Sequence, residues 1–512
     1  MPFVARLVPL VLGAALALGA VCAQAQGPGR AAIATPHAQA TAAAREVLEQ
    51  GGNAFDAAIA ISAALAVVEP YGSGLGGGGF FLLREGETPA RYAFIDARER
   101  APGKASEAMY LKDGKVQPGL SINGPLAAAI PGLPAALADL AAQYGKLPLK
   151  STLAPAIRLA NQGFAVDRIY RDRAQMRLGA LRDDPESARL FLINGEVPAL
   201  GAHIRQPELA ITLERIAYQG RDGFYAGPTA QAMVQGVQAA GGIWSLDDLA
   251  NYRTAKREPL RYQLADQREL ISAPPPSAGG VALAQSLAML QRLPWQSAEP
   301  VQRSHYVLEV LRRAYRDRGL LGDPDYVANP LPQLLARNYL TSLADSIDAH
   351  QATPSNSLPP APAWREGDHT THFALIDADG NAVAASKRPL SSMSPSFIES
   401  PTQFAAFGTP GGSRIPSMVL LSMLGFLEGK PVASWPAVPR YHHQYLPDVV
   451  EHEPGAFSTG QQRELQARGY QLKDLGRTYG NQQVLYWDKA GQTLEAASDP
   501  RGVGAAQVLS PR

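Results

Sequence analysis

Helix-like and strand-like patterns alternate along the first hundred residues. Apolar positions recur at helical spacing over residues 37–50, and Gly51-Gly52 ends this predicted helix. A second helix, rich in Ala and Ile, is predicted from Ala54 to Val68. Phe80–Arg84 and Tyr92–Ile95 then have the pattern of strands.

A proline-rich segment separates two parts of different character. Residues 104–345 are predicted to be mainly helical, with a capped helix start at residues 245–248. Residues 354–362 contain four prolines, which predicts a surface linker rather than a helix or central strand. After it, Thr371–Ile376 and residues 382–385 form a predicted hairpin around Asp379-Gly380. The helix predicted after Gly411-Gly412 has an apolar face made of Ile415, Val419, Leu420, Met423 and Leu427.

The N-terminus has the pattern of a signal peptide. Arg6 precedes the apolar stretch Leu7–Val21, and Ala23-Gln24-Ala25 forms a small-x-small cleavage site. The stretch is short for a membrane span, so a retained anchor helix is the less favoured alternative. We therefore expect a periplasmic or secreted protein without membrane attachment after cleavage. Its mature form has no cysteine, since Cys22 is the only one.

Charge and two candidate motifs narrow the possible functions. The net charge of +1 and the 18% of charged residues do not suggest a nucleic-acid partner. The glycine-rich loop 72–79 lacks the Lys-Ser/Thr ending of a phosphate-binding loop and precedes a strand, which favours close backbone packing. A structural role is also favoured over a metal site for one polar cluster, because its spacing matches no helical His pair. This cluster consists of His442, His443, Asp448, Glu451 and His452.

Thr370 is the candidate nucleophile. It lies in the sequence His369-Thr370-Thr371-His372, at the start of a predicted strand and after the linker. A Thr hydroxyl is a weak nucleophile unless a base lies beside it. Cleavage before Thr370 would create an α-amine with a pKa near neutrality within reach of that hydroxyl. One residue would then supply nucleophile and base, although an ordinary strand start would show the same short motif.

A series of motifs in order along nearly the whole chain resembles the γ-glutamyltransferase family. The matching segments are residues 51–58, Glu69-Pro70 with the glycine loop, 96–102, 131–132, 274–280, 322–324, 370–372, 389–395, 409–414 and 498–501. The resemblance implies an α/β fold, a four-layer αββα sandwich of the N-terminal-nucleophile hydrolase type. It also implies that the chain cleaves itself between His369 and Thr370. Segments 26–369 and 370–512 would then remain associated as one catalytic unit.

The resemblance further implies transfer of a γ-glutamyl group, for example from glutathione, to water or to an amino-acid acceptor, with no cofactor or metal. Thr370 corresponds to the nucleophile. Arg98, Ser391 and Ser392 match residues that hold the substrate α-carboxylate, and Arg98 alone could equally be a surface ion-pair residue. Gly411 and Gly412 match the oxyanion hole, which agrees with two backbone N–H groups at a helix N-terminus.

The chain departs from the family pattern at one place. Ser386 directly precedes Lys387, where the family has several dozen more residues. The missing stretch would supply the groups that bind the substrate α-ammonium and the loop that covers the site. We therefore expect weakened γ-glutamyl hydrolysis and transfer. The alternatives are a catalytically inactive relative that binds γ-glutamyl compounds, and an acylase of the same fold that acts on another amide.

Overall fold

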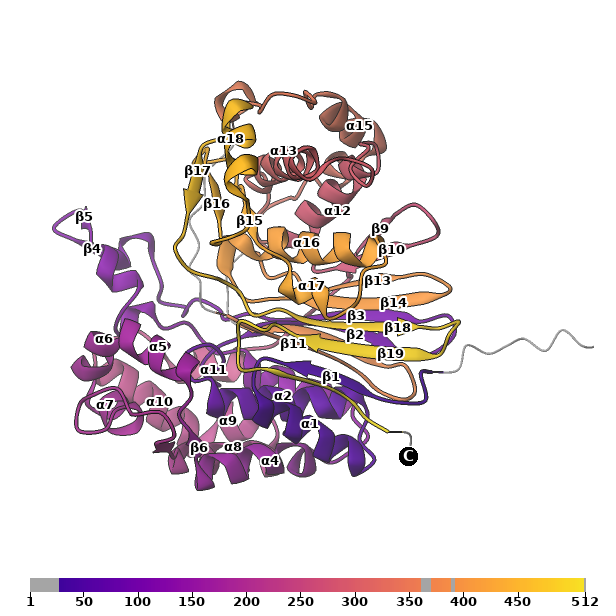
Figure 1. Ribbon diagram of the computed structural model, residues 1–512. Coiled ribbons are helices and arrows are strands. Elements are labelled where there is room, and N and C mark those ends of the chain that lie inside the picture. Colours follow the sequence, from indigo (N-terminus) through magenta and orange to yellow (C-terminus); the bar gives the residue numbers. More distant parts are fainter. Residues whose placement is uncertain (1–26, 361–369, 388–391, 511–512) are drawn as a thin grey trace, which may run out of the picture.

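Two antiparallel sheets lie face to face between two layers of helices, as Figure 1 shows. This computed structural model describes residues 27–360, 370–387 and 392–510. The predicted signal peptide, His369 and Ser391 lie outside the described residues. The four-layer αββα architecture predicted from the resemblance is confirmed.

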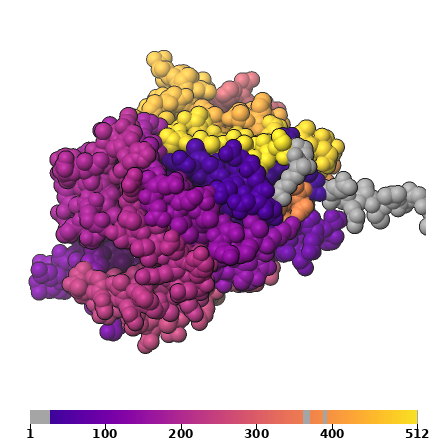
Figure 2. Space-filling view, turned by 90° about the horizontal axis from the view of Figure 1, so that it is seen from below, coloured from indigo at the N-terminus to yellow at the C-terminus, as the bar shows by residue number. Residues whose placement is uncertain are grey.

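The seven-stranded sheet combines strands from both sides of Thr370. Its order is β20 (Ala505–Val508), β1 (Ala32–Thr35), β11 (Thr371–Ile376), β12 (Ala382–Lys387), β2 (Gly79–Glu85), β3 (Arg91–Ala97) and β8 (Ala255–Arg257). The pairing of β1 with β20 places the N-terminal segment against the C-terminal strand, and Figure 2 shows these indigo and yellow segments side by side.

The six-stranded sheet is also built from both segments. Its order is β19 (Thr493–Ser498), β18 (Gln483–Asp488), β14 (Gln403–Gly408), β13 (Ser396–Glu399), β10 (Glu269–Ser272) and β9 (Leu260–Gln263). Smaller strands are β4 (Leu111–Lys112), β5 (Lys115–Val116), β6 (Phe164–Ala165), β7 (His203–Ile204), β15 (Tyr441–His442), β16 (Val450–His452) and β17 (Leu472–Asp474). Segments 26–369 and 370–512 are thus interleaved in the seven-stranded sheet, and in the six-stranded sheet they meet at the β13–β10 pair.

Helices cover the outer face of each large sheet (Figure 1). The seven-stranded sheet carries α1 (Ala38–Glu49), α2 (Ala54–Val68), α3 (Leu133–Gln143), α4 (Leu149–Gln162), α5 (Arg168–Met176), α6 (Leu178–Asp183), α7 (Pro185–Phe191), α8 (Pro207–Gln219), α9 (Asp222–Tyr225), α10 (Gly227–Ala239) and α11 (Leu246–Asn251) on its side. The other side has α12 (Gly279–Leu290), α13 (Pro300–Arg318), α14 (Leu331–Leu334), α15 (Arg337–Asp345), α16 (Ile415–Leu427), α17 (Ser434–Ala437) and α18 (Thr459–Ala467).

Alternating side chains of the seven-stranded sheet enter two separate cores. In β2, Phe80 and Leu82 join the core shared with the second sheet, while Phe81 and Leu83 join the core formed with α1 and α2. Because both faces are covered, β2 is a continuous hydrophobic run rather than an alternating pattern. Helix α2 is buried along its whole length for the same reason.

Most elements predicted from local pattern are confirmed. Helices α1 and α2, the hairpin of β11 and β12, and the capping box at Ser245 occupy the predicted places. The helix after Gly411-Gly412 differs in two respects. It begins at Ile415, after a 3-10 turn at Gly412–Arg414, and it is buried on all sides instead of along one face.

The predicted surface linker is partly wrong. Ser355 is fully buried, and Ser355–Ser357 forms a short 3-10 turn. The Ser355 backbone N–H donates to Asp448 Oδ2 at 2.7 Å, and its hydroxyl accepts a hydrogen bond from Arg312 at 2.5 Å. Proline content indicates a segment without helix or sheet, but it does not reveal that one serine is anchored in the interior.

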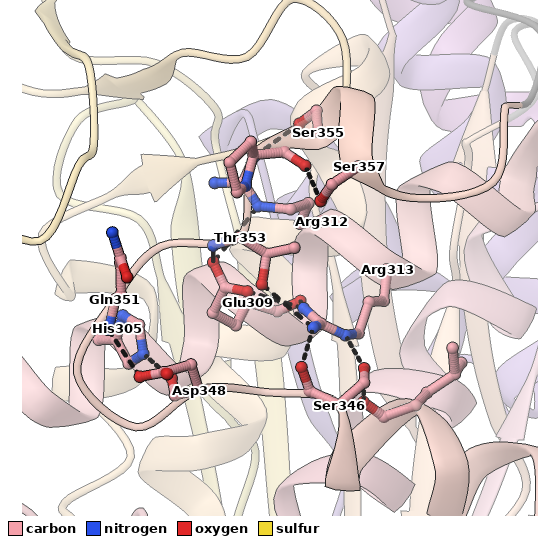
Figure 3. A network of polar contacts seen from close by, with 12 residues as sticks. His305, Glu309, Arg312, Arg313, Ser346, Asp348, Gln351, Thr353, Ser355 and Ser357 are labelled. Atoms are coloured by element: carbon pink, nitrogen blue, oxygen red, sulfur yellow. Dashed lines mark hydrogen bonds and ion pairs between the residues drawn. The ribbon is translucent and has the colours of Figure 1, made fainter.

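A buried polar network anchors this segment to α13 (Figure 3). The Glu309 carboxylate accepts hydrogen bonds from Arg313 at 2.7 Å and from the Thr353 backbone N–H at 3.2 Å. Arg312 pairs with Glu309 and with Asp448, which lies beyond Thr370 in the sequence. Burial acts to raise the pKa of Glu309, but Arg312 and Arg313 hold that pKa below its usual value. The network therefore joins the segment before the predicted cleavage site to the segment after it.

We predict that Asp448→Asn lowers the free energy of unfolding at pH 7 by about 1–2 kcal/mol, because a partly exposed but hydrogen-bonded carboxylate is lost. Burial opposes ionisation of Asp448, yet His443, the Ser355 N–H and Arg312 together lower its pKa. A carboxylate whose pKa is lower in the folded state stabilises the fold at pH values above its unfolded-state pKa. The difference in the free energy of unfolding between the variant and wild type should therefore shrink as the pH falls below about 4. Urea unfolding of both proteins at pH 7 and at pH 3.5 gives the difference in the free energy of unfolding at each pH and so measures both effects.

The matched control is Asp345→Asn, which removes an exposed 3.6 Å ion pair with Arg292. It should change the free energy of unfolding by less than about 0.5 kcal/mol at either pH. Equal losses in the two variants would contradict a special role for Asp448.

Candidate active site

Thr370 and Arg98 lie at the same end of the seven-stranded sheet. One register row crosses four adjacent strands at Thr371, Lys387, Gly79 and Ala97. Thr370 lies one residue before this row and Arg98 one residue after it. Neighbouring strands are about 4.8 Å apart, so the two backbones are about 14 Å apart across three strand spacings. A long arginine side chain can span much of that separation.

The Arg98 side chain extends back across the sheet. Its guanidinium carbon lies 5.8 Å from the ring centroid of Phe80 on β2, at the distance of a cation–π contact. Its backbone N–H donates to Asp96 Oδ1 at 3.1 Å, and its carbonyl accepts a hydrogen bond from the Tyr252 hydroxyl at 2.7 Å. Phe80 faces the second sheet, so Arg98 lies on the inner face of the sandwich.

The loop after α2 supports the backbone at Thr370. A Cβ atom on Gly72 would lie 3.5 Å from the Thr370 carbonyl oxygen, so the two backbones are in close contact. The Thr371 hydroxyl donates to Glu69 Oε2 at 2.7 Å. Since strand side chains alternate, Thr371 is directed toward α2 while Thr370 and His372 belong to the inner face. The candidate nucleophile therefore shares the inner face with Arg98.

His372 and Gly408 bring the second sheet to the same place. A Cβ atom at Gly408, the last residue of β14, would collide with the His372 imidazole. Burial lowers the pKa of His372 to about 3, so the ring is neutral near pH 7. Its Nδ1 forms a 3.0 Å hydrogen bond with the Ser386 hydroxyl. The contact fixes the end of β14 beside the start of β11.

Gly411 and Gly412 follow within three or four residues of this contact. A span of three residues reaches at most about 11 Å, so Gly411 lies within this distance of Gly408. The backbone φ angles are 144° at Gly411 and 59° at Gly412, in the region that favours glycine. A Cβ at Gly411 would also collide with Met418. The sequence predicts that these two glycines open the helix. Instead, Gly412 begins the 3-10 turn that precedes α16, so both glycines lie before the helix.

Ser392 is buried close to the start of α12. Its carbonyl accepts a hydrogen bond from the Ser394 hydroxyl at 2.7 Å. The Ser277 hydroxyl donates to the Met393 carbonyl at 2.6 Å, and a Cβ at Gly279 would collide with Ser394. The segment 277–279, matched in the sequence without a role, therefore holds the backbone beside Ser392.

The polar cluster of the C-terminal part supports the turn before α16. Arg414 forms a 2.6 Å ion pair with Glu451, and His442 Nδ1 lies 2.7 Å from the Ser417 hydroxyl. Burial lowers the pKa of His442 to about 3. In the described parts of the chain, no group of three or more His, Cys, Asp or Glu side chains could hold a metal ion. The cluster thus fixes the backbone next to Gly411-Gly412.

Several supporting residues were not identified from the sequence. Glu69, Gly408 and His372 position the strand ends, although each lies within or beside a matched motif. Arg257 pairs with Asp96 at 2.8 Å and with Asp325 at 3.2 Å. These three side chains line a cavity of about 100 Å³ together with Arg98. Only the pairing of distant strands reveals such contacts, because no local spacing indicates them.

Comparisons with known proteins show which family this chain is similar to. Residues 40–386 and 382–509 match the Gamma-glutamyltranspeptidase family. The chain is 35% identical to the glutathione hydrolase proenzyme of Escherichia coli K12 over 536 aligned positions, covering 92% of this chain and 90% of the relative. For the glutathione hydrolase proenzyme of Pseudomonas aeruginosa PAO1 the identity is 34% over 563 positions, covering 98% and 99%.

The fold is similar to that of a cephalosporin acylase from Bacillus halodurans. The TM-score is 0.83 at 24% sequence identity, with 99% of this chain and 98% of the acylase chain covered. This likeness concerns the fold.

None of the described helices is long and apolar enough to cross a membrane.

We predict that Gly408→Ala lowers the free energy of unfolding by about 1–3 kcal/mol, because the added methyl group overlaps the buried His372 ring and forces β14 away from β11. Urea unfolding measures the loss. Gly460→Ala on α18 is the control, since its Cβ would meet only Ser458 Oγ at 3.9 Å. This control should leave stability unchanged or raise it by up to about 1 kcal/mol. A Gly408→Ala protein as stable as wild type would show that the sheets can separate freely here.

Proposed function

The chain belongs to the γ-glutamyltranspeptidase family, and we propose that it hydrolyses γ-glutamyl amides such as glutathione with Thr370 as the nucleophile. The relatives that it matches over most of its length are glutathione hydrolases, so the chain is a γ-glutamyl hydrolase or transferase. One observation carries the assignment of the site. Thr370 and Arg98 lie at one end of the seven-stranded sheet, and the His372–Gly408 contact holds there the strand end from which the chain continues to Gly411-Gly412.

We infer that the precursor activates itself by one internal cleavage. The Thr370 hydroxyl oxygen bonds to the His369 carbonyl carbon as the peptide C–N bond breaks, and the released nitrogen becomes the Thr370 α-amine. Water then hydrolyses the resulting ester and frees the hydroxyl. The products are segments 26–369 and 370–512, whose association is supported by their interleaved strands. Residues 1–25 support export to the periplasm or out of the cell.

Turnover uses the same atoms in a second reaction. The Thr370 α-amine accepts the proton of the hydroxyl, whose oxygen attacks the γ-carbonyl carbon of the substrate. Backbone N–H groups of Gly411 and Gly412 stabilise the negative oxygen that develops. The leaving amine takes the proton, and water or an amino acid then releases the γ-glutamyl group. Arg98, with Ser391 and Ser392, holds the α-carboxylate through charge-assisted hydrogen bonds.

The proposed missing segment weakens recognition of the α-ammonium group. Two observations support a gap after Ser386: the family match divides at residues 382–386, and the 563 aligned positions of the Pseudomonas relative exceed the 512 residues of this chain. Strand β12 runs through this place without interruption, from Ala382 to Lys387. An acyl group without the amine should therefore be accepted almost as well. An acylase acting on another amide is the second candidate, supported by 35% identity over 371 aligned positions to the Acylase ACY 1 proenzyme of Pseudomonas sp. SE83, which covers 70% of this chain and 65% of that relative.

We predict two bands for the wild-type protein on a denaturing gel, corresponding to segments 26–369 and 370–512, and one band for Thr370→Ala. Removal of the hydroxyl removes the attacking atom, whereas the fold should persist because the backbone contacts at residue 370 remain. Thr370→Ser, which retains a hydroxyl, should still produce two bands. A single full-length band for the wild type after prolonged incubation would contradict self-processing.

We predict weak hydrolysis of a γ-glutamyl anilide and of its des-amino glutaryl analogue, with values of kcat/KM within about tenfold of each other. Loss of two charged hydrogen bonds to the ammonium group costs about 3–6 kcal/mol, which corresponds to two to four orders of magnitude at about 1.4 kcal/mol per tenfold. Release of the chromogenic aniline measures both rates. A strong preference for the γ-glutamyl compound would show that other residues bind the ammonium.

The control for this comparison is Arg98→Lys. Lysine keeps the charge but cannot reproduce the two parallel hydrogen bonds of a guanidinium to a carboxylate. The variant should still cleave into two chains and lose most turnover of both anilides, because both carry the corresponding carboxylate. Unchanged kinetics would mean that Arg98 does not contact the substrate.

A further inference from the structure

The end of helix α2 places a carboxylate beside the proposed nucleophile. Glu69 follows Val68, the last residue of α2, and only 4% of its surface is exposed. Its Oε2 accepts a 2.7 Å hydrogen bond from the hydroxyl of Thr371, which is also buried. Thr371 follows Thr370 and is the first residue of β11. The bond therefore joins the end of α2 to the chain one residue beyond the proposed cleavage site.

The backbone of Glu69 is fixed by the helix and by the turn that follows it. Its N–H donates to the Leu65 carbonyl at 2.8 Å, and its own carbonyl accepts the N–H groups of Gly72 and Ser73, each at 2.9 Å. Helix α2 is buried along its whole length and packs against β11 and β12 (Figure 1). The carboxylate that binds Thr371 is thus attached to a rigid support.

Two contacts fix the peptide group between Thr370 and Thr371. The hydrogen bond to Glu69 holds the Thr371 side chain, while pairing with Lys387 holds its backbone. The Thr370 carbonyl lies against the Gly72 backbone, because a Cβ on Gly72 would be 3.5 Å from its oxygen. That Cβ position is also 4.0 Å from Glu69 Oε2, so the three groups lie together. The orientation of this peptide group sets the direction of the Thr370 side chain.

A carboxylate is an unfavourable group at this end of α2. The C-terminus of a helix carries partial negative charge, and burial of a further charge costs free energy unless hydrogen bonds compensate it. The other acidic residue of this region, Asp56, lies in the first turn of the helix, where the same dipole favours it. Residues that depart from the local rules of stability are expected at functional sites. Glu69 therefore indicates a role beyond packing.

We propose that Glu69 is a positioning residue, whose hydrogen bond to Thr371 directs the Thr370 hydroxyl at the carbonyl carbon that it attacks. Glu69 does not touch the reacting atoms. A small displacement of a nucleophile slows its reaction steeply, because the attacking oxygen must be aligned with the carbonyl group. The inference rests on the proposed function and names a residue that controls the rates of self-cleavage and of turnover. Arg98 lies on the opposite face of the sheet, so recognition of the acyl group does not depend on Glu69.

Self-cleavage of the full-length chain tests this role. Thr371→Val keeps the branched shape but removes the hydroxyl, so the appearance of two bands on a denaturing gel should slow by about tenfold to hundredfold. Thr371→Ser retains the hydroxyl and should restore most of the rate. Glu69→Gln should slow cleavage less than Thr371→Val, since an amide oxygen still accepts a hydrogen bond that is weaker than that of a carboxylate. Cleavage of Thr371→Val at the wild-type rate would overturn the inference.

A double variant separates positioning from stability. Glu69→Met with Thr371→Val replaces both partners by apolar groups of similar shape, which should preserve or raise stability. Its urea midpoint, measured in the Thr370→Ala background where the attacking hydroxyl is absent, should equal or exceed that of Thr370→Ala alone. With Thr370 present, its cleavage should be as slow as that of Thr371→Val. Cleavage at the wild-type rate would show that the pair contributes only to stability and would overturn the inference.

The matched control is Thr229→Val on α10. It also removes a buried threonine hydroxyl that is hydrogen-bonded to a charged side chain, because Arg215 Nη1 donates to Thr229 Oγ1 at 3.0 Å. The rate of self-cleavage should not change. Slowing equal to that of Thr371→Val would overturn the inference, since cleavage would then respond to the loss of any buried hydrogen bond.

Kinetics of the cleaved protein separate failure of this inference from failure of the proposed function. With a γ-glutamyl anilide, Thr371→Val should lower kcat by about tenfold to hundredfold and leave KM nearly unchanged. Equal values of kcat and equal cleavage rates for variant and wild type would overturn this inference alone. A raised KM with unchanged kcat would also overturn it, because the pair would then act in binding. A wild type that neither cleaves itself nor hydrolyses the anilide would overturn the proposed function and this inference with it.

Discussion

The antiparallel register of β11, β12, β2 and β3 is the constraint on which the site depends. It aligns Thr371 with Ala97 across three strand spacings, so Thr370 and Arg98 emerge at one end of the sheet. A shift by one residue would turn the Thr370 side chain to the α2 face and separate it from Arg98. The register is protected because both faces of these strands are buried in different cores. The same burial that stabilises the sheet therefore sets the position of the proposed nucleophile.

Closure of the sandwich adds the second half of the site. Gly408 has no side chain, so β14 can end directly against the neutral His372 ring. A protonated imidazole there would have to be buried without a counter-charge, which is strongly unfavourable. Neutral His372 thus acts as a spacer between the sheets rather than as a proton carrier. Its position determines how close Gly411-Gly412, which follow strand β14 of the second sheet, can lie to Thr370.

Local pattern was sufficient for α1, α2 and the β11–β12 hairpin, because glycine stops and turn residues mark their ends. The motif series also indicated the sandwich and most residues of the proposed site. It did not reveal Glu69 beside Thr371 or the buried Ser355. Each of these depends on contacts between segments far apart in sequence, which no helical or strand period encodes. The start of α16 was misplaced for a related reason: a glycine pair favours a turn but does not determine how many residues the turn occupies.

The interleaving of the two segments would allow the proposed cut before residue 370 to leave the fold intact. Strands β11 and β12 from the second segment lie between β1 and β2 from the first, so separation would expose both cores. Before the proposed cut, the first segment is held at Ser355 by hydrogen bonds with Asp448 and Arg312. The proposed cleavage would add an α-amine at Thr370 and leave the strand register and the sandwich that position this residue in place.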